Sequence, residues 1–186
     1  MIISKTIVAI DSDVNFLDRL NGILNDLGVL DTYDYRQIEA RGATEEDVTT
    51  YCCTKMHELV SQSCSVELVL VDIVIVERDE LPQDRSGLAV ARGLGSMLCG
   101  VPILGITRYH KSYQLLSEIS LDLHVQGILL KGFLESKDFS RRDLVYIISK
   151  AREKAEVMKT PRRTDTVTVA STAERPFQNP DDSRCL

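Results

Sequence analysis

The chain has 186 residues, enough for one ordinary domain and an appendage, and 44% of them are apolar, which excludes global disorder. Its formal net charge of -6 argues against a surface made for polyanions, so we expect no nucleic-acid binding. The longest apolar run, around residues 68–76, contains Asp72 and is far shorter than the roughly 18 residues of a membrane span. Since the N-terminus also shows no leader pattern, the sequence predicts a cytoplasmic protein without a membrane anchor.

Five candidate strands alternate with helical patterns along the chain. Four of them are continuous apolar runs, at residues 6–10, 67–71, 101–106 and 125–130. Continuous runs of Val, Ile and Leu are typical of parallel strands that are covered on both faces. A fifth and more polar strand is expected near residues 29–35, and its polarity indicates a position at the edge of the sheet.

Apolar residues at helical spacing fill the intervals between these strands. The expected helices cover residues 17–27, 45–63, 88–98, 113–121 and 141–158. Gly28 is placed to end the first helix, and Ser140 with Asp143 forms a start signal for the last, beside Phe139 as a hydrophobic staple. The inward residues expected in the second helix are Val48, Cys52, Met56, Leu59 and Val60.

The alternation of strands and helices predicts an α/β fold, a doubly wound, five-stranded parallel sheet with right-handed crossovers. In such sheets the binding site lies at the carboxyl ends of the strands. Residues 1–159 are expected to form this domain. Residues 160–186 hold three of the five prolines and show little apolar periodicity, so they are predicted to be a disordered C-terminal tail.

Polar residues stand where four of the strands end. Asp11 and Asp13 follow the first strand, Asp72 ends the third, Thr107 ends the fourth and Lys131 follows the fifth. Taken singly, Asp13 could be a helix cap, Thr107 a turn residue and Lys131 a surface lysine. Asp72 stands inside an apolar run and must be partly desolvated unless it is paired or bound to a cation. In the predicted sheet all of these residues converge on one edge.

A carboxylate cluster beside a lysine suits the transfer of a phosphoryl group to Asp72. Crowded carboxylates repel one another unless a cation joins them, and Mg²⁺ prefers oxygen ligands. Such an ion neutralises the charge of an incoming phosphoryl group. Lys131 would then pair with one phosphoryl oxygen, and the Thr107 hydroxyl would donate a hydrogen bond to another.

These residues, with the fragment LLKGF around Lys131, resemble the receiver domain of two-component response regulators over roughly residues 4–158. The resemblance implies a flavodoxin-like fold with Asp72 as the phosphoacceptor, assisted by Thr107 and Lys131. It also implies a histidine kinase or phosphotransfer protein as the donor. Beyond phosphotransfer and self-dephosphorylation no enzymatic activity is implied, and the output would be a contact with an unknown downstream protein. A homodimer is compatible with this reading.

The resemblance also implies a magnesium site, and the sequence departs from the family pattern there. The implied ligands are Asp11, Asp13, Asp72 and the backbone carbonyl of Val74. Ser12 stands where the family has a second acid, so Asp13 is expected to substitute for it and the affinity for Mg²⁺ is put in doubt. Two other departures are Gly132 in place of the usual proline and Ile128 in place of the usual aromatic switch residue. Residues 77–86 form a charged insertion after Asp72, either a solvated loop or a docking loop.

Two other functions remain open at this stage. The first is a degenerate receiver that binds proteins without being phosphorylated, which the departures at Ser12 and Ile128 favour. The second is a phosphatase resembling the haloacid-dehalogenase type, with Asp11 as the nucleophile. That reading leaves Asp72 without a role, and no acidic pair after Lys131 completes the metal site that such phosphatases have.

Overall fold

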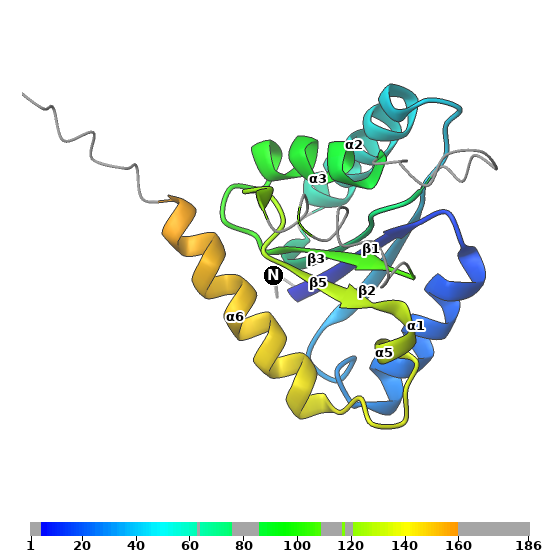
Figure 1. Ribbon diagram of the computed structural model, residues 1–186, viewed down its shortest axis with the longest axis vertical. Coiled ribbons are helices and arrows are strands. Elements are labelled where there is room, and N and C mark those ends of the chain that lie inside the picture. Colours follow the sequence, from blue (N-terminus) through cyan, green and yellow to red (C-terminus); the bar gives the residue numbers. More distant parts are fainter. Residues whose placement is uncertain (1–4, 63, 76–85, 109–116, 118–120, 160–186) are drawn as a thin grey trace, which may run out of the picture.

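Five parallel strands form a single sheet in the computed structural model, which describes residues 5–62, 64–75, 86–108, 117 and 121–159 (Figure 1). The order of the strands across the sheet is β2-β1-β3-β4-β5. Their bounds are Lys5–Asp11 for β1, Asp34–Glu39 for β2, Ser65–Asp72 for β3, Ile103–Thr107 for β4 and Gly127–Leu130 for β5. The predicted fold class, a doubly wound parallel sheet, is therefore confirmed.

Helices cover both faces of the sheet. The helices α1 (Val14–Asp26) and α6 (Arg141–Lys159) lie on one face, and α2 (Glu45–Ser61) and α3 (Ser86–Met97) lie on the other (Figure 1). The single turn α5 (Lys131–Leu134) follows β5 directly. No helix in the described part of the chain is both long and apolar enough to span a bilayer.

The core consists of two apolar layers separated by the sheet. Successive side chains of a strand point to opposite faces, and β1 shows this directly. Ile7 packs in the layer that contains Phe16 of α1 and Leu144 of α6, whereas its neighbour Val8 packs in the layer that contains Met56 of α2. The central strands are buried on both faces, which explains their continuous apolar runs.

The second strand is the element that the sequence placed wrongly. It covers Asp34–Glu39, not residues 29–35, although its edge position was predicted correctly. Val29 belongs instead to the turn after α1, where its N–H donates to the carbonyl of Leu24, and its side chain is buried in the core. An edge strand that is half exposed carries little apolar signal, so the buried valine before it dominated the pattern.

The helix ends follow the predicted signals. Gly28 has a φ of 64°, the left-handed conformation that glycine adopts most readily after a helix. Ser140 and Asp143 exchange the two hydrogen bonds of a capping box at the start of α6. In α2 the prediction for Val60 was wrong, because its side chain faces solvent. The expected helix at 113–121, the insertion at 77–86 and the tail at 160–186 lie wholly or mostly outside the described residues.

Candidate functional site

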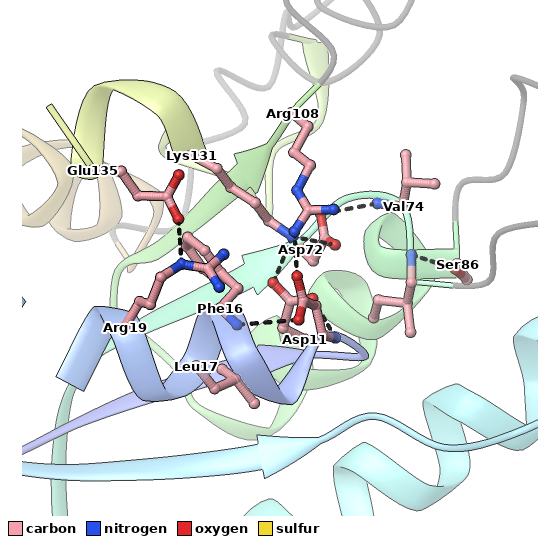
Figure 2. A network of polar contacts seen from close by, with 12 residues as sticks. Asp11, Phe16, Leu17, Arg19, Asp72, Val74, Ser86, Arg108, Lys131 and Glu135 are labelled. Carbon is pink, nitrogen blue, oxygen red and sulfur yellow. Dashed lines mark hydrogen bonds and ion pairs between the residues drawn. The ribbon is translucent and has the colours of Figure 1, made fainter. Parts of the chain in front are cut away.

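Three buried charged residues meet at the carboxyl ends of the strands. Asp11 ends β1, Asp72 ends β3 and Lys131 follows β5. The Lys131 Nζ lies 2.6 Å from Asp11 Oδ2 and 2.8 Å from Asp72 Oδ2, and it donates a hydrogen bond to the latter (Figure 2). All three residues are buried, so these ion pairs are shielded from water. The structure thus brings together the three residues on which the sequence prediction depended most.

An aromatic ring supports the lysine. The Lys131 Nζ lies 4.6 Å from the centroid of the Phe16 ring, which belongs to the first turns of α1 and is fully buried. A cation over the face of an aromatic ring is attracted electrostatically, by about 1 to 2 kcal/mol when it is desolvated. The ring therefore helps to hold the lysine amine beside the two carboxylates. Phe16 was not among the residues singled out from the sequence, so this contact was not predicted.

The electrostatics of Asp72 are those of a buried acid. Burial and the negative charge of Asp11 together raise the pKa of Asp72 from 3.8 to about 7, against the opposing effects of Lys131 and of the Val74 N–H. That N–H donates to Asp72 Oδ1 over 3.3 Å. Near neutral pH, Asp72 therefore exchanges between a protonated and an ionised form.

The two carboxylate oxygens of Asp11 have different partners. Its Oδ1 accepts a hydrogen bond from the Asp13 N–H over 2.9 Å. Its Oδ2 is buried and lies close to Lys131, but no donor meets it with hydrogen-bond geometry. Two carboxylates with a single lysine between them also leave a net negative charge when both are ionised. A carboxylate oxygen with a lone pair to spare, in a site of net negative charge, fits a small divalent cation.

The protein would supply such a cation with few ligands. Among the described residues, no group of three or more His, Cys, Asp or Glu side chains could hold a metal ion. Mg²⁺ commonly binds through one or two carboxylates and keeps several waters. The donor set of Asp11 and Asp72 therefore fits Mg²⁺ as a partly hydrated ion, and does not fit an ion that requires a complete protein cage.

Asp13 is engaged in two contacts of its own. Its Oδ1 accepts from the Phe16 N–H over 3.1 Å as the N-cap of α1, and its Oδ2 pairs with the guanidinium of Arg108. Burial raises the pKa of Asp13, but the hydrogen bonds from Phe16 and Arg108 outweigh it and hold the pKa below its usual value. The helix-cap role weighed from the sequence is therefore present, and a metal-binding role for Asp13 stays a prediction.

Arg108 is a site residue that the sequence prediction missed. It follows Thr107 at the end of β4, and its side chain is 51% exposed. Its guanidinium extends toward the carboxylates (Figure 2). Burial lowers the pKa of Arg108, but the hydrogen bond to Asp13 and the charges of Asp13, Asp11 and Asp72 outweigh it and raise the pKa above its usual value. The only signal in the sequence was a basic residue directly after a strand-end threonine.

The remaining predicted residues lie at the same edge. Thr107 is fully buried and pairs in register with Leu130, the residue before Lys131. Val74 is half-buried beside Asp72, and its N–H is the group that contacts the carboxylate. Ser12, which stands in place of an acid, is exposed. The roles of Thr107 toward a phosphoryl group and of the Val74 carbonyl toward a metal stay predictions.

The start of α3 closes tightly over the backbone of Asp72. A Cβ atom on Gly87 would lie 1.8 Å from the Asp72 carbonyl oxygen, so only glycine fits there. The Gly87 N–H donates to the Ile73 carbonyl over 3.2 Å, and the Ile75 N–H donates to the Ser86 hydroxyl, also over 3.2 Å. These contacts fix the backbone at the candidate phosphoacceptor. Gly87 was not singled out from the sequence, because the need for glycine arises only from its contact with the Asp72 backbone.

Comparisons with known proteins agree on the fold. No protein-family model and no curated protein matches the chain. Among solved structures, the signal receiver domain of the response regulator merR from Colwellia psychrerythraea 34H is 15% identical, with a TM-score of 0.52 over 81% of this chain and 99% of that one. The response regulator RcsB from Salmonella typhimurium is 14% identical, with a TM-score of 0.54 over 86% of this chain and 68% of that one.

A third structure gives the same result. The non-phosphorylated receiver domain of RcsB from Escherichia coli is 13% identical, with a TM-score of 0.53 over 81% of this chain and 94% of that one. At such identities the likeness is one of fold. The chain has the fold of a response-regulator receiver domain, as the resemblance in its sequence implied.

Proposed function

We propose that this chain is a cytoplasmic response-regulator receiver that accepts a phosphoryl group on Asp72. The observation that carries the proposal is the buried contact of Lys131 with both Asp72 and Asp11 at the carboxyl edge of a receiver-type sheet. Burying two acids and one base together costs free energy that a purely structural site would avoid. Buried ionisable groups that are retained despite this cost are typical of functional sites. The proposed domain covers residues 1–159, with residues 160–186 as a tail.

The proposed donor is a phosphohistidine of a kinase or phosphotransfer protein. An ionised oxygen of Asp72 attacks the phosphorus, the new O–P bond forms as the P–N bond breaks, and the leaving imidazole takes up a proton. The pKa of about 7 keeps a large fraction of Asp72 ionised at neutral pH. Hydrolysis of the acyl phosphate by water later returns the carboxylate and inorganic phosphate.

Lys131 changes its partner in this reaction. In the unmodified protein it donates to Asp72 Oδ2, and after transfer it pairs with a phosphoryl oxygen while it keeps its contact with Asp11. The Phe16 ring holds the amine in reach of both positions. The Thr107 hydroxyl donates to a second phosphoryl oxygen, which couples the modification to the segment after β4. A downstream protein would read that change.

The proposed magnesium ion would be held by Asp11 and Asp72, with Asp13 and the Val74 carbonyl as further ligands. When bound, it would supply positive charge that neutralises the incoming phosphoryl group. The buried Asp11 oxygen without a hydrogen bond supports this assignment.

Intact-mass analysis after treatment with acetyl phosphate and Mg²⁺ tests the proposal. We expect one phosphoryl adduct on the wild-type chain and none on Asp72→Asn. The control Asp18→Asn removes an exposed acid from α1 and should be modified like the wild type. An adduct that persists in Asp72→Asn would place the site elsewhere.

The same experiment separates the alternatives. No adduct on the wild type at high Mg²⁺ would overturn the proposal in favour of a receiver that acts without phosphorylation. Steady turnover of a small phosphate ester, lost in Asp11→Asn and kept in Asp72→Asn, would instead indicate a phosphatase.

A further inference from the structure

A second cationic side chain, that of Arg108, lies at the exposed side of the site. Lys131 pairs with the two buried acids, and Arg108 pairs with Asp13 nearer the surface. With every group ionised, the three carboxylates and two cations leave a single negative charge. Figure 2 shows the two cationic side chains converging on the carboxylates from the ends of neighbouring strands, β4 and β5.

The contacts of Asp13 leave it little capacity for another ligand. One of its oxygens caps α1 through the Phe16 N–H, and the other is taken by the Arg108 guanidinium. The backbone N–H of Asp13 is itself the donor to Asp11 Oδ1, so the residue cannot move without disturbing the deeper site. A divalent ion at Asp11 and Asp72 can recruit Asp13 only by displacing the arginine.

We propose that Arg108 is an internal counter-ion that competes with a divalent cation for Asp13 and thereby sets the Mg²⁺ affinity of the site. This inference rests on the proposed function. It attributes a lower Mg²⁺ affinity to Arg108, a positioning residue that is not itself a ligand of the metal. The pair is half exposed, with Arg108 51% and Asp13 26% accessible, and exposed ion pairs are weak enough to be displaced. Arg108 therefore lowers the affinity without abolishing binding.

Titration of the full-length chain with Mg²⁺, followed by calorimetry, tests the inference without any phosphoryl donor. Arg108→Gln should bind Mg²⁺ about tenfold more tightly than the wild type, since it frees Asp13 and removes a unit charge beside a divalent ion. Arg108→Lys keeps the charge and should stay closer to the wild type than to Arg108→Gln.

Arg19→Gln is the matched control. Arg19 lies on α1, affects the pKa of Asp13 through its charge, and pairs with Glu135 over 2.8 Å without touching Asp13. Its loss should change the Mg²⁺ affinity by less than about threefold, because exposed charges at longer range are screened. Equal tightening in Arg19→Gln and Arg108→Gln would show a general charge effect and overturn the inference.

Two further results would also overturn it. One is an unchanged or weaker affinity in Arg108→Gln; the other is the absence of Mg²⁺ binding in all of these variants. Phosphorylation is measured separately on the same samples by intact mass. An adduct on Asp72 without a change in Mg²⁺ affinity would refute the role of Arg108 and leave the proposed function standing. Tighter Mg²⁺ binding in Arg108→Gln without any adduct would refute the proposed function and leave the role of Arg108 standing.

Discussion

Replacing Asp72 with asparagine should make the protein more stable at pH 8. Burial and the neighbouring Asp11 raise the pKa of Asp72 from 3.8 to about 7, so the folded state holds a costly ionised carboxylate above that pH. At about 1.4 kcal/mol per pKa unit, the penalty that asparagine removes is about 2 to 4 kcal/mol, after allowing for a poorer contact with Lys131.

The pH dependence of this gain follows from the sign of the shift. Because the folded pKa is raised, the folded state binds the proton more tightly than the unfolded chain does. Wild-type stability from this group is therefore full below about pH 4 and is lost as the pH rises to about 7. Asparagine cannot ionise, so the advantage of Asp72→Asn should shrink as the pH falls from 7 and vanish near pH 4.

Urea denaturation at several pH values between 4 and 8 measures this difference, and Asp18→Asn serves as the control. Asp18 is exposed, so its substitution should change the free energy of unfolding by less than about 0.5 kcal/mol at any pH. A variant Asp72→Asn that is less stable than the wild type at pH 8 would refute the reasoning. So would a gain that does not depend on pH.

Four other substitutions test the site and the fold. Lys131→Met should lower the free energy of unfolding by about 3 kcal/mol, because two buried carboxylates lose their cation. Adding Asp72→Asn should recover much of that loss in urea denaturation, whereas independent effects would contradict the proposed coupling. Gly87→Ala should lower the free energy of unfolding by more than about 2 kcal/mol, because its Cβ meets the Asp72 carbonyl. Gly132→Ala has open space around it and should leave the melting temperature nearly unchanged. Similar melting temperatures for the two variants would contradict this reasoning. Ser140→Ala should lower the free energy of unfolding by about 1 kcal/mol, because α6 loses its N-terminal cap. Chemical denaturation measures this loss, and an undetectable change would count against the capping role.

The sequence determined the class of fold and the edge of the sheet where the charged residues meet. The strands β1, β3 and β4 were visible as mostly apolar runs because burial on both faces leaves few polar positions in them. Once the strands are parallel, their carboxyl ends lie at the same edge of the sheet, and this is where Asp11, Asp72 and Lys131 are found. The capping box at Ser140 was equally readable, because it depends on residues only three positions apart.

Only the tertiary structure decided how these residues are held. Phe16 beneath Lys131, Gly87 against the Asp72 backbone and Arg108 on Asp13 are contacts between elements far apart along the chain. The position of β2 was misjudged for a related reason, since Val29 is buried by packing and not by membership of a strand. Local patterns record which residues avoid water. They do not record which distant side chain each one meets, and that choice determines the charge balance of the site.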